Sequence, residues 1–160
     1  MPYIHSFGAH LPERIVTNAE IAARVGKPAE WIESASGIRE RRWASAETSV
    51  ADLAVAAAED CLARGGSSPD QLGMIIVASG SSAANGFPGP AAAVAARLGL
   101  EGTPALDVPM ASAGSLFALV MAAQFADAYK DVLVIGAEKM SAIVEMGAGA
   151  DGALDPNTGI

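Results

Sequence analysis

Three short, mainly apolar runs separated by helical patterns constrain the fold of this chain more than any other feature. They are Leu72 to Ala78, Ala105 to Val108 and Asp131 to Ala137, and they are rich in valine, isoleucine and leucine. Runs of this kind are typical of parallel strands that are covered on both faces. Strands that alternate with helices imply right-handed crossovers. The sequence therefore predicts an α/β fold with a mostly parallel sheet flanked by helices.

Helical spacing of apolar residues predicts the elements between and before these strands. The expected helices cover residues 50–64, 88–98 and 111–129, and a shorter helix begins near Asn18. Asn18 and Thr48 are the side chains that we expect to cap helix starts. The alternating residues Tyr3 to Leu11 predict one further strand. In folds of this class the chemistry lies at the carboxyl ends of the strands, so function is expected in the segments that follow them.

Charge and composition exclude several classes of function. A formal net charge of −8 at pH 7 would repel a phosphate backbone, and aromatic residues make up 5% of the chain, so we expect no nucleic-acid partner. Cys61 is the sole cysteine, which excludes an intrachain disulfide and a cysteine-based metal cluster and favours a cytoplasmic protein. The first residues show no secretory pattern. The most apolar stretch, Ala111 to Ala126, is shorter than a bilayer-spanning helix of about 20 residues, so no membrane role is expected.

Ser112 stands where the second apolar strand passes through a tight turn into the long helix. The N–H groups at a helix start favour negative charge, so a developing oxyanion would be stabilised there. Ala111, Ala113 and Gly114 are small and leave room for a substrate carbonyl. A serine is also a common helix cap, and its position alone favours that structural role.

Three further segments resemble those of one family. EWI at 30–32 precedes SGIRER at 36–41, NGFP occupies 85–88, and DVPMASAG occupies 107–114. They resemble the EWI…TGIRER, HAFP and DVAAACAG segments of the β-ketoacyl-acyl-carrier-protein synthase III family, in the same order and at compatible spacing. The resemblance runs over residues 1–160 and implies the amino-terminal half of a thiolase-like layered fold, with the carboxyl-terminal half absent from this chain.

The resemblance implies an acyltransferase of fatty-acid or polyketide-type biosynthesis. In the family, a cysteine at the position of Ser112 takes an acyl group from a thioester, and a histidine and an asparagine of the second half then assist condensation. The resemblance also implies a homodimer, an acyl-coenzyme A or acyl-carrier-protein thioester as substrate, and neither a metal nor a further cofactor. An acyl carrier protein is accordingly an expected partner.

The resemblance assigns substrate-binding roles to Trp31, Arg39 and Phe87. Trp31 corresponds to a tryptophan that stacks on the adenine of coenzyme A, and Phe87 to a phenylalanine that closes the partner subunit's acyl pocket. Arg39, with the neighbouring arginines, would meet an acidic carrier or phosphopantetheine. A structural alternative remains for each residue. Trp31 could be a partly buried helix residue, Phe87 a residue of its own core, and Arg39 a member of a solvated salt-bridge network. The family has an arginine where this chain has Ala35, which favours a carrier-bound thioester over coenzyme A.

Serine in place of cysteine leaves three interpretations open. A cysteine thiol ionises readily at a helix start, whereas a serine hydroxyl needs a positioned base. The chain is then a natural variant that forms an oxyester, a synthase inactivated by a cysteine-to-serine change, or a non-catalytic thiolase-fold partner subunit. A serine hydrolase is disfavoured because Met110 replaces the first glycine of the G-x-S-x-G elbow. The glycine-rich stretch 147–152 lacks a following helix and is not expected to bind a dinucleotide.

Overall fold

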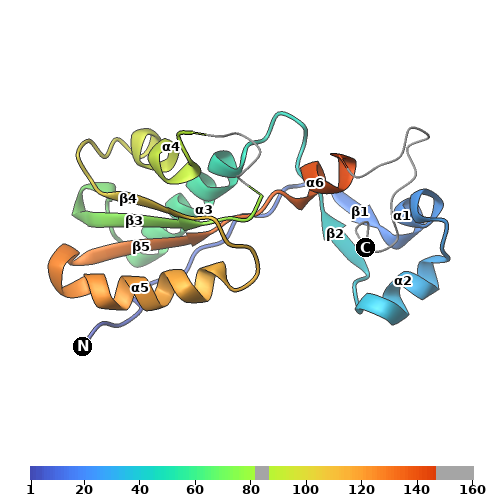
Figure 1. Ribbon diagram of the computed structural model, residues 1–160, viewed down its shortest axis with the longest axis horizontal. Coiled ribbons are helices and arrows are strands. Elements are labelled where there is room, and N and C mark those ends of the chain that lie inside the picture. The colour runs from blue at the N-terminus through green and yellow to red at the C-terminus, as the bar shows by residue number, and fades with distance from the viewer. Residues whose placement is uncertain (82–86, 147–160) are drawn as a thin grey trace. The chain divides into compact units, whose positions relative to one another are not determined.

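The computed structural model describes residues 1–81 and 87–146 (Figure 1). The chain divides into two compact units. The first contains Met1–His10 and Thr48–Glu138, and the second contains Leu11–Glu47 and Lys139–Ile160. Each unit is built around its own sheet.

The first unit holds a three-stranded parallel sheet in the order β4-β3-β5. Its strands are β3 (Leu72–Ala78), β4 (Ala105–Val108) and β5 (Asp131–Gly136). Ala78 pairs with Val108 on one side and with Gly136 on the other, so the three carboxyl ends lie at the same edge. The predicted parallel sheet is confirmed, and the apolar runs coincide with its strands to within one residue.

Helices cover both faces of this sheet (Figure 1). They are α3 (Val50–Gly65), α4 (Pro90–Arg97) and α5 (Gly114–Tyr129), with a short 3-10 turn, η1 (Pro69–Gln71), before β3. Ile75 and Val77 pack with α3 and α4, whereas Met74 and Ile76 pack with α5. Burial of alternate residues on opposite faces explains why β3 is apolar along its whole length.

In its described residues, 11–47 and 139–146, the second unit combines a two-stranded antiparallel sheet with three helices. Its elements are β1 (Ile15–Thr17), α1 (Asn18–Val25), α2 (Ala29–Ser36), β2 (Glu40–Arg42) and α6 (Met140–Met146). Val16 of β1 lies opposite Arg41 of β2. A small core of Val16, Ile21, Ile32 and Trp43 joins the strands to α1 and α2. The sequence pattern did not predict this antiparallel pair.

The expected cap of the first helix was wrong by one residue. Thr17, rather than Asn18, caps α1, because its hydroxyl accepts from Glu20 N at 3.4 Å while Glu20 Oε1 accepts from Thr17 N at 2.9 Å. The residue three positions after Asn18 is Ile21, which is apolar and cannot reciprocate. The capping box therefore selects the threonine.

The same shift occurs at the start of α3, where Ser49 rather than Thr48 is the cap. Asp52 Oδ2 accepts from Ser49 N at 2.6 Å, and Ser49 Oγ accepts from Asp52 N at 3.1 Å. The bonds from the Ser49 side chain and backbone hold the pKa of Asp52 below its usual value, with a smaller contribution from Arg97. Asp52 also forms an ion pair with Arg97 of α4 at 2.6 Å.

The strand expected over Tyr3 to Leu11 is wrong: these residues form no strand. Their hydrogen bonds go to the end of α3 instead, since His5 Nε2 lies 3.0 Å from Gly65 O and Ser6 Oγ donates to Cys61 O at 2.9 Å. A strand needs a hydrogen-bonded neighbour, and β5, the outermost strand on that side of the described sheet, does not pair with this segment. Among the described residues, no helix is long and apolar enough to cross a bilayer.

Candidate active site

Ser112 lies in a tight turn between the end of β4 and the start of α5. Gly114 N donates to Ala111 O at 3.1 Å, which closes the turn. Ser112 has a φ of 48°, and Ala113 has φ and ψ of −78° and −7°. These values are those of a type II′ turn, whose first central position prefers glycine. A serine there costs about 1–2 kcal/mol of backbone strain.

The structure corrects the interpretation of Ser112 as a helix cap. The helix expected from residue 111 begins at Gly114, and its N-cap position is Ala113. Within the described part of the chain, no side chain makes a capping bond at this helix start. Ser112 is exposed. Its hydroxyl is therefore not used to satisfy the helix and stands open beside it.

The turn packs tightly on the carboxyl end of β3. A Cβ atom added to Gly80 would lie 2.9 Å from Ala111 N and 3.0 Å from Ala111 Cα. A Cβ atom on Gly114 would lie 3.2 Å from Ala78 Cβ. The small residues around Ser112 were expected to leave room for substrate, but the structure shows that Gly80 and Gly114 permit close packing beneath the turn.

Glu138 is a residue of this region that sequence reasoning missed. It follows β5, and its carboxylate accepts from Gly80 N at 2.6 Å and from Ser81 N at 2.9 Å. The only sequence signal was an acidic side chain directly after a buried parallel strand. Asp107, at the end of β4, acts in a similar way on another element, because its Oδ1 accepts from Ala91 N at 2.8 Å and holds the start of α4.

Phe87 belongs to the same unit as Ser112 and is 97% exposed. The alternative that its ring lies in the core of its own unit is therefore wrong. The preceding Asn85 and Gly86 of the same motif lie outside the described residues, as does the glycine-rich stretch 147–152. The expected role of Phe87 at a subunit interface stays a prediction.

Trp31 and Arg39 belong to the second unit. Trp31 is a residue of α2 and is 38% exposed, while its neighbour Ile32 is fully buried. Lys27 Nζ lies 5.5 Å from the centroid of the indole ring. The Arg39 side chain is 83% exposed and forms an ion pair with Glu33, with 2.9 Å between Nε and Oε1. Both side chains are open to solvent on at least one side.

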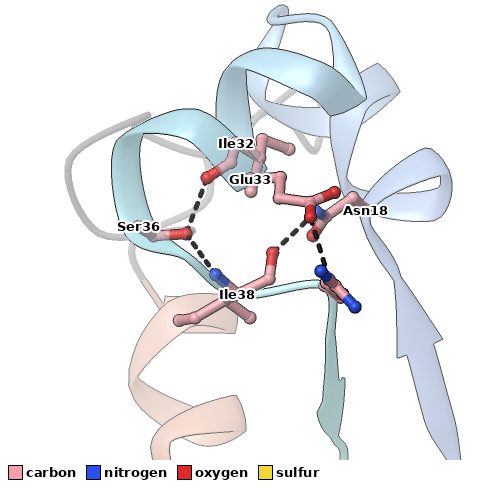
Figure 2. A network of polar contacts seen from close by, with 6 residues as sticks. Asn18, Ile32, Glu33, Ser36 and Ile38 are labelled. Carbon is pink, nitrogen blue, oxygen red and sulfur yellow. Dashed lines mark hydrogen bonds and ion pairs between the residues drawn. The ribbon is translucent and has the colours of Figure 1, made fainter.

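Arg41 and Arg42, the arginines that follow Arg39, make hydrogen bonds within the second unit. Arg41 donates to Asn18 Oδ1 at 2.8 Å. Asn18 Nδ2 donates in turn to Ile38 O at 2.7 Å (Figure 2). Burial lowers the pKa of the Arg41 guanidinium. Arg42 donates to Pro12 O at 3.2 Å. Both arginines therefore make structural contacts within the second unit, and a role for them in substrate binding stays a prediction.

Ser36 links α2 to the following loop in the same network. Its hydroxyl donates to Ile32 O at 2.6 Å and accepts from Ile38 N at 3.1 Å (Figure 2). Gly37, between them, has a φ of 72° and ends the helix in the left-handed conformation. The SGIRER segment thus forms a helix stop and leads into β2, and its serine is a structural residue.

A groove of about 380 Å³ lies in the first unit, and its lining includes neither Ser112 nor Phe87. It runs between the N-terminal segment, α5 and β5, which is an edge strand of the described sheet. Its lining is mainly apolar and includes Tyr3, Ile4, Leu119, Val132 and Val134. Among the described residues, no cluster of three histidine, cysteine or acidic side chains could hold a metal ion.

Known proteins share both the sequence and the fold of this chain. The β-ketoacyl-acyl-carrier-protein synthase III 1 of Vibrio parahaemolyticus is 40% identical over 136 residues, which are 84% of this chain and 43% of that protein. The Helicobacter pylori synthase III is 34% identical over 144 residues, 89% of this chain and 44% of that protein. The chain therefore spans less than half the length of these relatives.

Solved structures of synthases of the same kind have a similar fold to this chain. The 3-oxoacyl-acyl-carrier-protein synthase III of Aquifex aeolicus superposes with a TM-score of 0.81 at 37% identity, covering 87% of this chain and 45% of that chain. The priming β-ketosynthase of the R1128 polyketide pathway gives 0.79 at 29% identity, covering 86% and 42%. The model of the thiolase N-terminal domain matches residues 36–152. The chain therefore belongs to the thiolase family, whose amino-terminal domain it carries, and is similar to the synthases III.

Proposed function

We propose that this chain is the amino-terminal half of an acyltransferase of the synthase III kind, with Ser112 as the acyl acceptor. The observation that carries the proposal is the state of Ser112. Its side chain is exposed, takes no part in capping α5, and sits in a strained turn at the carboxyl end of a parallel sheet. Strain of this kind persists where surrounding structure enforces it, and it is often found at functional sites.

The proposed step transfers an acyl group from sulfur to oxygen. Ser112 Oγ bonds to the thioester carbonyl carbon, the carbon–sulfur bond breaks, and the thiol leaves with the proton that a base removes from the hydroxyl. The products are an oxyester on Ser112 and a free thiol. A serine hydroxyl needs such a base, which we place in the carboxyl-terminal half. The N–H groups at the start of α5 would stabilise the oxyanion.

The substrate in this proposal is an acyl thioester of coenzyme A or of an acyl carrier protein. The exposed face of Trp31 suits stacking on a flat base, and the exposed guanidinium of Arg39 suits a phosphate or an acidic carrier. Phe87 presents its ring to solvent, as a residue that completes a second subunit's acyl pocket would. We propose that the complete protein is a homodimer located in the cytoplasm.

The carboxyl-terminal half is proposed to cover the outer face of α5. Leu116, Phe117 and Val120 are all more than half exposed on this helix. A contiguous apolar surface of this kind marks an interaction site. Because the relatives are about twice as long as this chain, the occupant we propose is the remainder of the same protein.

The proposal is tested by mass spectrometry of the complete protein after incubation with acetyl-coenzyme A. The unchanged protein is expected to gain one acetyl group on Ser112. Ser112→Cys should acylate faster, because a thiol at a helix start ionises more readily. Ser112→Ala should gain none. Equal labelling of all three proteins would show that position 112 is not the acyl acceptor.

The second candidate is a non-catalytic thiolase-fold partner subunit, and serine at the cysteine position is the observation that favours it. It predicts no adduct on the unchanged protein and none on Ser112→Cys. An adduct on Ser112→Cys alone would instead indicate a synthase inactivated by exchange of its cysteine for serine. The same three proteins therefore separate all the alternatives.

A further inference from the structure

We infer that Glu138 is a positioning residue for the Ser112 turn: its carboxylate holds the backbone at Gly80 and Ser81, against which that turn packs. The inference rests on the proposed function, since it deepens the account of the same site. Glu138 reaches this place because β5 pairs with β3, Ala78 lies opposite Gly136, and Ala137 N donates to Ala78 O at 3.0 Å.

The two hydrogen bonds hold two successive peptide units, Ser79–Gly80 and Gly80–Ser81. Both carboxylate oxygens of Glu138 are used, one for Gly80 N at 2.6 Å and one for Ser81 N at 2.9 Å. Bonds from N–H groups to a charged acceptor are stronger than bonds between neutral groups. Two such bonds to successive N–H groups restrict the rotation of both peptide units, so the backbone that follows β3 is held by the residue that follows β5.

The backbone at Gly80, which Glu138 holds, packs directly against the Ser112 turn. Gly80 approaches Ala111 so closely that a methyl group at Gly80 would lie 2.9 Å from Ala111 N. Ser79 N donates to Val108 O at 3.1 Å, which ties the same segment to the end of β4. Ala111 immediately precedes Ser112 and accepts the bond that closes the turn. A shift of Gly80 would therefore be passed directly to the backbone of Ser112.

The positive φ of Ser112 makes this support relevant to catalysis. A non-glycine residue leaves such a conformation unless its surroundings hold it. With Glu138→Gln, one oxygen remains as an acceptor, and the other position becomes an NH₂ group that faces an N–H donor. The backbone at Gly80 and Ser81 would be held less firmly, while the shape of the side chain at position 138 is conserved. The expected loss is therefore in the orientation of the Ser112 hydroxyl, not in binding of the thioester.

The test measures single-turnover acylation of the complete protein by acetyl-coenzyme A. Glu138→Gln should lower the limiting acylation rate about 10- to 100-fold, the range expected when a reacting group is displaced by up to about 1 Å. The acetyl-coenzyme A concentration at half-maximal rate should change less than about twofold. Gly80→Ala, which disturbs the same contact from the other side, should act alike. Glu20→Gln is the matched control, because Glu20 binds Thr17 in the other unit, and it should leave the rate unchanged.

The same changes are repeated in the Ser112→Cys protein, so that the inference and the proposed function fail separately. If the unchanged protein is not acylated but Ser112→Cys is, the role of Ser112 as acceptor is wrong. The effect of Glu138→Gln is then measured as the change in the acylation rate of the Ser112→Cys thiol. A folded Glu138→Gln or Gly80→Ala protein that acylates at the unchanged rate overturns the inference. Unfolding of both variants also overturns it, because Glu138 would then be a purely structural residue. Absence of acylation in every protein refutes both.

Discussion

Helices α3 and α5 each span 16 residues and pack on opposite faces of one sheet, yet they differ in how they begin and in which residues they bury. The start of α3 is closed by the Ser49–Asp52 capping box, and its apolar residues face the core. The start of α5 has no side-chain cap among the described residues, and its buried residues are Gly114 and Ala118. The contrast teaches that α3 is complete within this chain, whereas α5 leaves its first turn and its outer face for other partners.

The largest effect is expected from a charge on the outer face of α5. Val120→Lys should destabilise the complete protein by about 3–5 kcal/mol, because an unpaired charge would be buried under the second half. In residues 1–160 alone, where Val120 is 63% exposed, the same change should raise the soluble fraction. Thermal unfolding and sedimentation measure the two outcomes. Ala63→Lys on the exposed side of α3 is the control, and it should alter neither. Equal stability of Val120→Lys and the unchanged complete protein would show that this face is never covered.

A smaller effect is expected at the two helix starts. Ser49→Ala removes the cap of α3 and should cost about 1 kcal/mol in denaturant unfolding. Ala113→Ser should gain almost nothing at α5, because Ala113 has helical rather than extended backbone angles and its side chain would not reach the cap position. A clear gain from Ala113→Ser would break the distinction between the two helix starts.

The strain at Ser112 gives a third prediction. Ser112→Gly should stabilise the protein by about 0.5–1 kcal/mol, because relief of about 1–2 kcal/mol of strain exceeds the conformational entropy cost of glycine, about 0.5–1 kcal/mol. Acylation should be lost in the same variant. Urea unfolding of the Gly and Ala variants isolates the backbone effect, since both lack the hydroxyl. If glycine is no more stable than alanine, the turn is not strained.

The smallest effect concerns pH and the α3 capping box. The pKa of Asp52 is lower in the folded chain than its ordinary value of 3.8, so this carboxylate contributes stability that is present above that value. The contribution is lost as pH falls through the lowered folded pKa. Asp52→Asn should therefore make the stability of the protein less dependent on pH below about 4. Unfolding free energies measured between pH 7 and pH 3 check this, and unchanged curves would count against the capping bond.

The parts of the fold that local pattern determines could be predicted from the sequence. The runs 72–78 and 105–108 are strands because they are mainly apolar, and their parallel pairing follows from the helix between them. The caps were misplaced by one residue because the expectation weighed the capping residue alone and not the acidic side chain three positions later. The segment from Tyr3 failed as a strand because strand formation depends on a neighbour that local pattern does not reveal.

The candidate site divides in the same way. Ser112 could be found from its position after a strand and from the motif around it. Its positive φ could not, because a serine rarely adopts such an angle and the close contact of Ala111 with Gly80 is visible only in the structure. Glu138 lies 58 residues from Gly80 along the chain, so only the pairing of β3 with β5 brings them together. Contacts between strand ends are the part of a site that a single sequence hides.

The position of β5 has a consequence for synthesis. β5 is an edge strand of the described sheet and has an apolar groove beside it, so its backbone groups on one side can pair with another chain. In a protein of its relatives' length, this half leaves the ribosome first, and at about 5–20 residues per second the second half follows only after several seconds. During that interval, neighbouring nascent chains compete for the open edge. The open edge of β5 is thus a place where a newly made chain needs protection from aggregation.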